Sequence, residues 1–263
     1  MNNRRSHVYA AAKTWNVAMP PGNFNRNNDY PVCAHCDLRV LCRPAGHGAE
    51  LLPSARILIH RRPVRRGGHV FRMGEPCHSL YAICTGSARA SQLTADGGMQ
   101  VTGFHFSGDL IGVDALGTRE QRCDVVALEP IVVCEIALQR LEEIAERAPV
   151  LQRMLLCLLS DELAYSQETL VAFLGKKSAA ARLAAYLGGV ARRLERRGLR
   201  PEDIGLQMSR SDLGNYLGIA KETVSRLFTR FATDGLLRFE ARRFWVDDLA
   251  RLTELAARLE PDN

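Results

Sequence analysis

The pattern of apolar and polar positions changes along the chain, and its first regular part has the period of short strands. Between Arg56 and Leu138, apolar or alternating segments are separated by turns that contain glycine. The segments are FRM, SLYAICTG, ARASQLT, MQVTGFHF, CDVVAL and IVVCEI. Such segments are typical of strands, and Asp96-Gly97 is a strong hairpin signal. Many short strands at regular spacing predict a small antiparallel barrel or roll.

A helical period follows the strands. A short helix is expected over residues 141–148, before Pro149, and a long one over residues 150–174. In the long helix, apolar residues recur at steps of three and four, which predicts an a/d seam of nearly three heptads. Such a seam between two domains favours a dimerisation helix over packing within its own domain. The seam positions are Leu156, Leu159, Leu163, Ser166, Leu170 and Phe173, with Ser166 as the polar exception.

Residues 207–230 have the pattern of a helix, a tight turn and a second helix. Ser209 is placed to cap the first helix, with Asp212 as the acidic partner of a capping box. Gly218 ends that helix, because glycine adopts a positive φ without steric cost. A further helix is expected over residues 178–197, before this pair.

The second helix of the pair, starting near Lys221, has one apolar and one polar face. Val224, Leu227, Phe228 and Phe231 are expected to point inward, which leaves Lys221, Glu222, Ser225, Arg226 and Arg230 outside. Such a helix fits the DNA major groove. The alternative is an ordinary helical hairpin with a solvated face. Two strands expected around Glu240-Ala241, with Arg242 and Arg243 at their turn, favour a winged helix-turn-helix instead.

Charge supports a nucleic-acid partner for the C-terminal part. The chain has 263 residues, enough for two domains, and a net charge of +6. From Lys176 onward there are 17 Lys and Arg against 12 Asp and Glu, so +5 of the net charge lies there. A basic segment around a helix-turn-helix suits a phosphate backbone. The sequence has no apolar run that would span a membrane and no secretory signal, so a cytoplasmic location without membrane contact is expected.

Cysteine spacing near the N-terminus predicts a metal site. Cys33, Cys36 and Cys42 form C-x2-C-x5-C between Pro31 and Pro44, after a polar segment, residues 1–30, that is expected to be a flexible tail. Thiolates are ligands that iron–sulfur clusters and zinc both prefer. Three unrelated cysteines are the alternative. A fourth ligand is needed, and spacing alone leaves it open. The candidates are His35, Cys77, Cys84, Cys123, Cys134 and Cys157.

From about Pro31 onward the chain resembles the CRP/FNR superfamily of bacterial transcription regulators, and within it the FNR type, the oxygen-sensing iron–sulfur branch. The resemblance rests on the cysteine spacing and on SLYAICTGSARA, GFHFSGDLIGVDALG, VVCEI, KKSAAARLAAYL and SRSDLGNYLGIAKETVSRLF. It implies an α+β architecture with a cyclic-nucleotide-binding-like β-roll. The implied parts are a cysteine-rich loop at 31–50, the β-roll at 51–148, a dimerisation helix at 149–175 and a winged helix-turn-helix at 176–263.

The resemblance also implies a cofactor, one [4Fe-4S] cluster per subunit. By position its ligands would be Cys33, Cys36, Cys42 and Cys134, the cysteine of VVCEI. The remaining cysteines would then be non-ligands: Cys77, Cys84, Cys123 and Cys157. In the family, oxygen converts the cluster to a smaller form, the dimer weakens and DNA affinity falls.

The implied function is that of a global regulator that senses oxygen and is not an enzyme. As a homodimer it would bind palindromic TTGAT-like promoter sites under anaerobic or low-oxygen conditions and work with RNA polymerase. The base-reading positions of the family fall on Glu222, Ser225 and Arg226. Arg can bind guanine O6 and N7 together, and Glu can accept from cytosine N4. Lys221 departs from the family pattern and is expected to bind phosphate or to shift base preference.

Two other departures and three alternatives accompany this interpretation. Ala220 gives the recognition helix no side-chain cap, and Ser166 in the seam leaves the control of dimerisation open. A zinc-stabilised regulator would use the same four cysteines. A cyclic-nucleotide sensor would need Glu and Arg-Ser, where this chain has Asp109 and Arg122-Cys123. An iron–sulfur enzyme would need a substrate pocket with acid, base or redox partners, for which the sequence has no motif.

Overall fold

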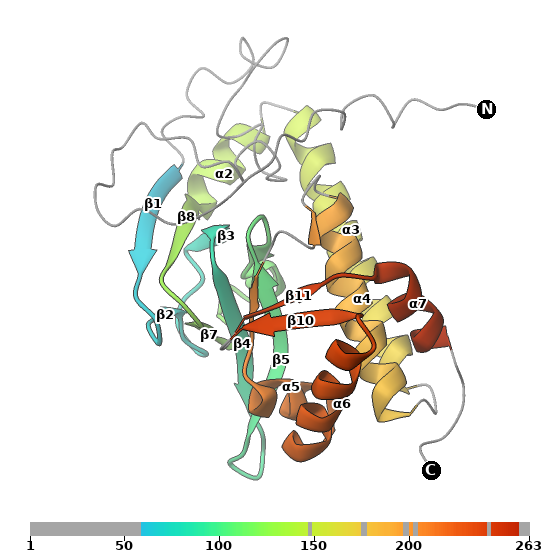
Figure 1. Ribbon diagram of the computed structural model, residues 1–263. Coiled ribbons are helices and arrows are strands. Elements are labelled where there is room, and N and C mark those ends of the chain that lie inside the picture. Colours follow the sequence, from blue (N-terminus) through green and yellow to red (C-terminus); the bar gives the residue numbers. More distant parts are fainter. Residues whose placement is uncertain are drawn as a thin grey trace, which may run out of the picture.

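Two four-stranded antiparallel sheets form the N-terminal domain (Figure 1). The computed structural model describes residues 59–146, 149–174, 178–196, 200–201, 205–240 and 243–257. One sheet has the order β1-β8-β3-β6 and the other β2-β7-β4-β5. The strands are β1 (Ile59–Val64), β2 (His69–Phe71), β3 (Ser79–Thr85), β4 (Ser87–Leu93), β5 (Met99–Phe106), β6 (Leu110–Ile111), β7 (Asp124–Ala127) and β8 (Ile131–Ala137), with a 3-10 turn at Val113–Ala115.

Both faces of the first sheet are buried. Ile83 and Val133 point into a core that includes Phe71 and Val125 of the second sheet, so this core fills the space between the sheets. The opposite face carries Leu80 and other apolar residues, which pack against the helices that follow β8. Burial on both faces explains why β3 and β8 are almost continuously apolar in sequence.

Strand β1 was not among the segments expected from the sequence. It carries the polar run His60-Arg61-Arg62 and then Pro63, which interrupts the apolar pattern. Proline lacks the N–H that a strand donates, and it is tolerated at the edge of a sheet. β1 occupies such an edge and pairs with β8 alone in its sheet.

Two helices follow the β-roll. α2 (Leu138–Ala145) begins at the end of β8, and α3 (Pro149–Leu174) is the long helix. The expected start of α2 at residue 141 was wrong by three residues, because the chain turns into the helix at Leu138, which is itself buried against the sheet. Pro149 is the first residue of α3, a position where the missing N–H of proline costs nothing. Among the described residues, no helix is long and apolar enough to cross a membrane.

The C-terminal domain is a winged helix-turn-helix, which confirms the expected α+β architecture. Its helices are α4 (Ala179–Arg196), α5 (Arg210–Leu217), α6 (Lys221–Thr233) and α7 (Leu249–Ala257). Its strands are β9 (Leu206–Gln207), β10 (Leu237–Glu240) and β11 (Arg243–Val246), in the order β10-β11-β9. β10 and β11 are the two expected wing strands, whereas β9 was not expected, because two residues carry no periodicity.

The two domains share one hydrophobic core. Val101, Phe104 and Phe106 of β5 belong to the same buried cluster as Leu187 of α4 and Leu213 of α5. The ring of Phe104 lies 5.6 Å from Tyr216 of α5, edge to face. Figure 1 shows β5 beside α5, with α3 and α4 to the right of β5. The outer face of the second sheet is therefore the support on which the helix-turn-helix lies.

Candidate functional site

The helix-turn-helix is stabilised by local interactions that the sequence predicts. The Ser209 hydroxyl accepts a hydrogen bond from the backbone N–H of Asp212 at 2.9 Å, which caps α5. Gly218 ends α5 with φ 64°, a left-handed conformation. The Asp212 carboxylate bonds the Ser209 hydroxyl and pairs with Arg89 of β4. The expected cap is confirmed, and its acidic partner also ties the helix to the β-roll.

The two faces of α6 are as expected. Val224, Leu227, Phe228 and Phe231 are buried in the domain core. Lys221, Glu222, Ser225, Arg226 and Arg230 are exposed on the other face. Ala220 supplies no side-chain cap. The recognition helix is thus held by its apolar face and presents its polar face to solvent, which is the geometry a major-groove helix needs.

The candidate base-reading side chains lie along the helix in the free protein. The Ser225 hydroxyl donates to the carbonyl of Lys221 at 3.0 Å. The Arg226 guanidinium donates to the Thr223 hydroxyl at 3.2 Å. Both bonds join exposed side chains to their own helix, so DNA competes only with weak local contacts when these groups turn toward base edges.

The wing contacts the β-roll. The Arg243 guanidinium donates to the Glu129 carboxylate at 2.7 Å, and Ser87 donates to the same carboxylate at 2.9 Å. Arg243, expected at the wing turn as a phosphate ligand, is therefore engaged in an ion pair between domains. Arg242 lies outside the described residues.

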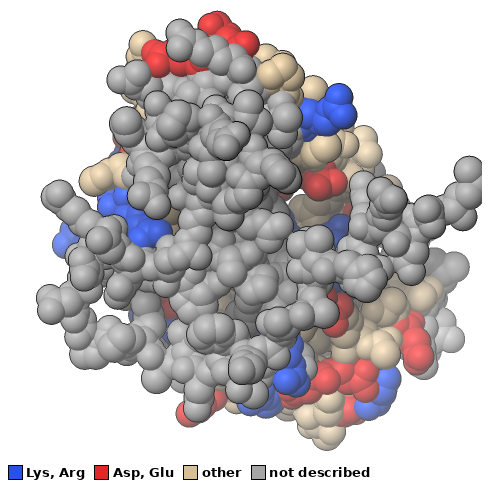
Figure 2. Space-filling model, turned by 90° about the horizontal axis from the view of Figure 1, so that it is seen from above, with Lys and Arg blue, Asp and Glu red and all other residues tan. Residues whose placement is uncertain are grey.

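Side chains of both charges are visible on the face of the molecule that Figure 2 shows. On that face the visible Lys and Arg side chains alternate with Asp and Glu. The net positive charge of the chain is therefore not gathered among the described residues visible there. The exposed cations of α6 are Lys221, Arg226 and Arg230.

Of the four ligands that the resemblance implies, Cys134 is among the described residues, whereas Cys33, Cys36 and Cys42 lie outside them. It is buried on β8 and shares a sheet face with Val132 and Ile136, as expected. Its sulfur lies 2.9 Å from the sulfur of Cys84 on β3. Within the described part of the chain, no group of three or more His, Cys, Asp or Glu could hold a metal.

The described part of the chain begins on the strand beside Cys134. β1, the first described element, pairs with β8 so that Ile59 lies opposite Ile136 and Arg61 opposite Cys134. Sixteen residues separate Cys42 from Ile59, and an extended chain of that length spans roughly 50 Å. Cys134 fits an iron–sulfur cluster by its chemistry, because cysteine thiolates are the ligands that such clusters use.

The other described cysteines differ from Cys134. Cys123 faces the core between the sheets, where burial raises the pKa of its thiol to about 12. Burial likewise raises the pKa of Cys77, whose thiol donates to the carbonyl of Ser79. Cys157 is exposed on α3. Cys134 differs from these three in its place on β8, opposite Arg61 of β1.

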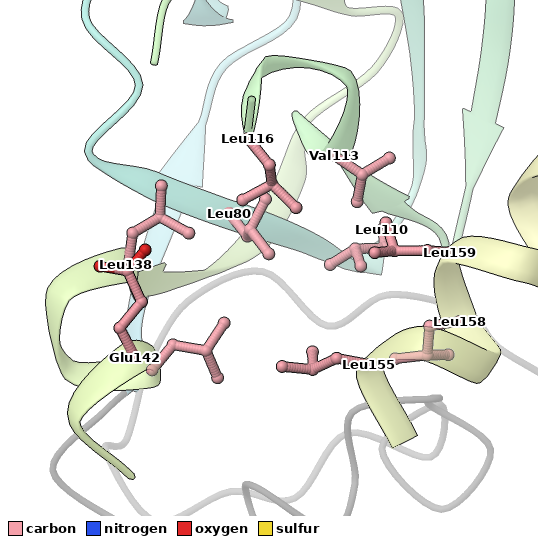
Figure 3. A pocket seen from close by; sticks show the side chains of 10 residues that line it. Leu80, Leu110, Val113, Leu116, Leu138, Glu142, Leu155, Leu158 and Leu159 are labelled. Atoms are coloured by element: carbon pink, nitrogen blue, oxygen red, sulfur yellow. The ribbon is translucent and has the colours of Figure 1, made fainter. Parts of the chain in front are cut away.

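An apolar pocket adjoins the Cys134 face of the sheet. It lies between the β-roll, α2 and α3, and Figure 3 shows Leu80, Leu138, Leu155 and Leu158 among its lining. Leu80 and Leu138 also pack in the cluster that contains Cys134. The surroundings of Cys134 thus continue into apolar space on the side of α3.

The predicted seam of α3 is exposed in the single chain. Leu156, Leu163 and Leu170 are 66%, 60% and 55% exposed, and Leu159 is 36% exposed. Ser166 is exposed among them. Phe173 lies in the last turn of α3, and its side chain is outside the described residues. A row of exposed leucines along one helix marks an interaction surface.

A cyclic-nucleotide sensor would need Glu and Arg-Ser at or near Asp109 and Arg122-Cys123, and these residues have other surroundings here. Asp109 is fully buried, and its carboxylate pairs with Arg193 of α4 at 3.1 Å and accepts from the N–H of Phe106 at 2.8 Å. Cys123 is buried between the sheets, whereas Arg122 is exposed. The ion pairs of Arg193 are not predictable from a local pattern, because its partners are 84 and 31 residues away in the chain.

Two family models match this chain, one in each of its two domains. The family model of the cyclic nucleotide-binding domain matches residues 61–148, and that of the Crp-like helix-turn-helix domain matches residues 181–255. The chain is 37% identical over 225 residues to the transcriptional activator protein anr of Pseudomonas aeruginosa, covering 85% of this chain and 92% of that protein. It is 36% identical to the fumarate and nitrate reduction regulatory protein of Escherichia coli strain K12, covering 85% and 90%.

A solved structure has the same arrangement. FixK2 from Bradyrhizobium japonicum aligns with a TM-score of 0.65 and 30% sequence identity, covering 76% of this chain and 98% of that one. The alignment thus extends over nearly the whole of that protein.

Proposed function

Because the chain belongs to the CRP/FNR family and is a transcription regulator of the FNR type rather than an enzyme, we propose that it senses oxygen through a [4Fe-4S] cluster. As a homodimer it binds palindromic TTGAT-like promoter sites when oxygen is scarce and acts on RNA polymerase there. The ligands are Cys33, Cys36, Cys42 and Cys134. The β-roll at 51–148 is the sensing domain, the helix at 149–175 forms the dimer, and the winged domain at 176–263 binds DNA.

The position of Cys134 carries the proposal. It is buried on the face of β8 that packs against α2 and α3, next to the strand through which the N-terminal segment enters the sheet. When bound, the cluster supplies an oxygen-labile centre. Cys134 links that centre to the sheet, and Leu138 and Leu141 link the same sheet face to α2. Loss of the bond to Cys134 would therefore disconnect the cysteine-rich loop from this face of the sheet.

The exposed face of α6 supports DNA recognition. Glu222, Ser225 and Arg226 are the base-reading groups, and Lys221 binds the backbone or adjusts base preference. Arg226 is long enough to bind guanine bidentately, and one such pair discriminates between bases by about 1–3 kcal/mol. The exposed leucines of α3 support the homodimer, because two copies of this helix bury each other's apolar row.

Substitution of single cysteines tests the ligand assignment. Cys134→Ala, purified without oxygen, is expected to lose iron, sulfide and anaerobic DNA binding. Cys123→Ala is the matched control, since it removes another buried cysteine of the same domain and is expected to retain all three. A Cys134→Ala protein with full iron and sulfide would refute the assignment.

Substitution on α6 tests the base contacts. Arg226→Ala is expected to relax the preference for the guanine of the half-site, measured by comparing binding to wild-type and guanine-substituted operators. Arg230→Ala, which removes an exposed cation from the same helix near Asp234, is expected to weaken both complexes alike. Unchanged base preference in Arg226→Ala would limit that residue to phosphate contact.

Zinc is the second candidate for the four thiolates. It would leave the DNA-binding half unchanged but remove oxygen as the signal. Metal analysis separates the two, because the zinc site contains no sulfide and does not change in air.

A further inference from the structure

Cys84 and Cys134 are in contact on the buried face of the first sheet. Their sulfur atoms lie 2.9 Å apart and share a hydrogen bond in which either thiol can donate. Both residues are 4% exposed. The family resemblance gives Cys84 no role, and no part of the proposed function uses it.

The sheet itself holds the two thiols together. β3 and β8 pair along their length, with Ala82 opposite Cys134, and a register shift between Ile83 and Thr85 places Cys84 in a bulge. Cys84 and Cys134 share one core cluster, so both side chains leave the sheet on the same face. β8 is also paired with β1 on its other side. The contact is therefore fixed by backbone ladders rather than by mobile loops.

The geometry points to a redox-modification site. We propose that, once the cluster is lost, Cys84 and Cys134 form an intrachain disulfide under peroxide and that this bond keeps Cys134 from accepting a new cluster until a thiol reductant breaks it. A disulfide joins sulfurs about 2.05 Å apart, so the two atoms need to approach by less than about 1 Å. Formation of the bond stands on the geometry alone, and its consequence for the cluster rests on the proposed function.

The oxidation takes two electrons from the two thiols. Because both thiols are buried, the reaction occurs when local opening of the sheet admits solvent. One sulfur, as thiolate, then attacks an oxygen of hydrogen peroxide; the O–O bond breaks, and the leaving hydroxide takes up the proton of that thiol as water. The product is a sulfenic acid. The second sulfur then attacks the sulfenic sulfur, the S–S bond forms and the S–O bond breaks, and the hydroxyl leaves with the second proton as water. Two thiols and one peroxide give one disulfide and two waters.

Reduction restores the ligand. A dithiol reductant attacks one sulfur of the bond and exchanges through a mixed disulfide, which returns both thiols. The site therefore makes cluster assembly depend on the thiol pool as well as on oxygen. A peroxide stress that outlasts the supply of thiols would keep the protein cluster-free even after oxygen is gone.

Peptide mapping of the full-length protein tests bond formation. The protein is purified with its cluster, stripped in air with a chelator, treated with hydrogen peroxide, and digested without reduction. The expected product is one peptide pair joined through Cys84 and Cys134, lighter by two hydrogen atoms than the separate peptides and lost on reduction. Cys134 recovered as a thiol, or joined to Cys33, Cys36 or Cys42, would overturn the inference. This measurement on the unaltered chain requires no variant to fold.

Variants then test the consequence. After peroxide, the wild-type protein is expected to rebuild its cluster from iron and sulfide only when dithiothreitol is added, measured by visible absorbance and iron content. Cys84→Ser is expected to rebuild it without dithiothreitol. Cys77→Ser, which alters a neighbour in the same core, is the control and is expected to behave like wild type. Equal dependence on dithiothreitol in Cys84→Ser would overturn the inference.

Failure of the inference and failure of the proposed function are distinguishable. If Cys134→Ala holds a normal cluster, the ligand assignment falls, whereas the Cys84–Cys134 peptide still forms in wild type. If the linked peptide is absent while Cys134→Ala lacks the cluster, the proposed function stands and the inference falls.

Discussion

Gly214 shows how closely the two helices of the DNA-reading motif approach each other. A Cβ atom at this position would lie 2.5 Å from the carbonyl oxygen of Ile219, in the turn between α5 and α6. That oxygen belongs to the backbone, so it cannot move aside as a flexible side chain would. The angle between the helices depends on this absence of a side chain.

Gly214→Ala is expected to destabilise the protein by about 2 kcal/mol, in the range for an overpacked contact, and to weaken DNA binding because α6 is displaced. Urea denaturation and operator binding measure the two effects. Gly189→Ala is the control: it lies in α4 with open space around its Cβ position, and alanine favours a helix. Normal DNA affinity in Gly214→Ala would show that the turn yields without consequence.

The thiol of Cys123 is expected to be inert. Burial raises its pKa to about 12, so at pH 8 only about one molecule in ten thousand carries the reactive thiolate. In the folded protein, iodoacetamide at pH 8 should leave Cys123 unmodified, whereas it should react fully after unfolding in urea. Rapid labelling of Cys123 in the native state, detected by peptide mass, would show that the core between the sheets opens readily.

At the scale of elements, one arginine joins three parts of the fold. The Arg193 guanidinium of α4 lies 3.1 Å from the Asp109 carboxylate before β6 and 2.9 Å from the Glu162 carboxylate of α3. It also lies over the ring of Tyr165, 4.4 Å from the centroid. Burial works against its charge, but the two carboxylates prevail and raise the pKa of Arg193. The network links the β-roll, the dimerisation helix and the DNA-binding domain.

Arg193→Met is expected to lower the free energy of unfolding by about 3 kcal/mol, because it leaves the carboxylate of the fully buried Asp109 without its cation. Combining it with Asp109→Asn should recover part of that loss. Arg192→Met removes an exposed neighbour that bonds Thr253 and should change stability by less than about 0.5 kcal/mol. Equal stabilities of the two single variants would show that the network contributes nothing.

The exposed leucines of α3 are expected to form the contact between the two subunits. Leu163→Glu is expected to convert the anaerobic protein from dimer to monomer, because it places a charge in each of the two facing apolar rows. Leu93→Glu is the matched control: that leucine is 68% exposed on β4, against 60% for Leu163, and lies outside the seam. Light scattering measures the mass. A dimeric Leu163→Glu would remove α3 as the dimer contact.

At the scale of the whole molecule, local rules predicted the helix-turn-helix, and long-range pairing determined what the sequence did not show. The Ser209 cap, the Gly218 stop and the inward face of α6 act within a few turns of chain, so they were predicted. β1 was missed because Pro63 breaks its pattern. The Cys84–Cys134 contact joins residues 50 positions apart and depends on strand register, which no local pattern encodes.

Three hydrophobic clusters join the parts of the fold to one another. One fills the β-roll, one joins the Cys134 face of the sheet to α2 and α3, and one joins β5 to the DNA-binding domain. The second contains the proposed ligand and reaches α3 through Leu155 and Leu158. Under the proposed function, a change at Cys134 would therefore reach α3 through packed side chains without passing through the DNA-binding domain.

Metal analysis decides whether this chain holds an oxygen-labile iron–sulfur cluster. The protein is purified without oxygen, and iron, sulfide and zinc are measured per subunit before and after brief exposure to air. About four iron and four sulfide per subunit are expected, and both should be lost in air together with operator binding. Zinc in their place, with content and DNA binding unchanged by air, would contradict the proposed cluster.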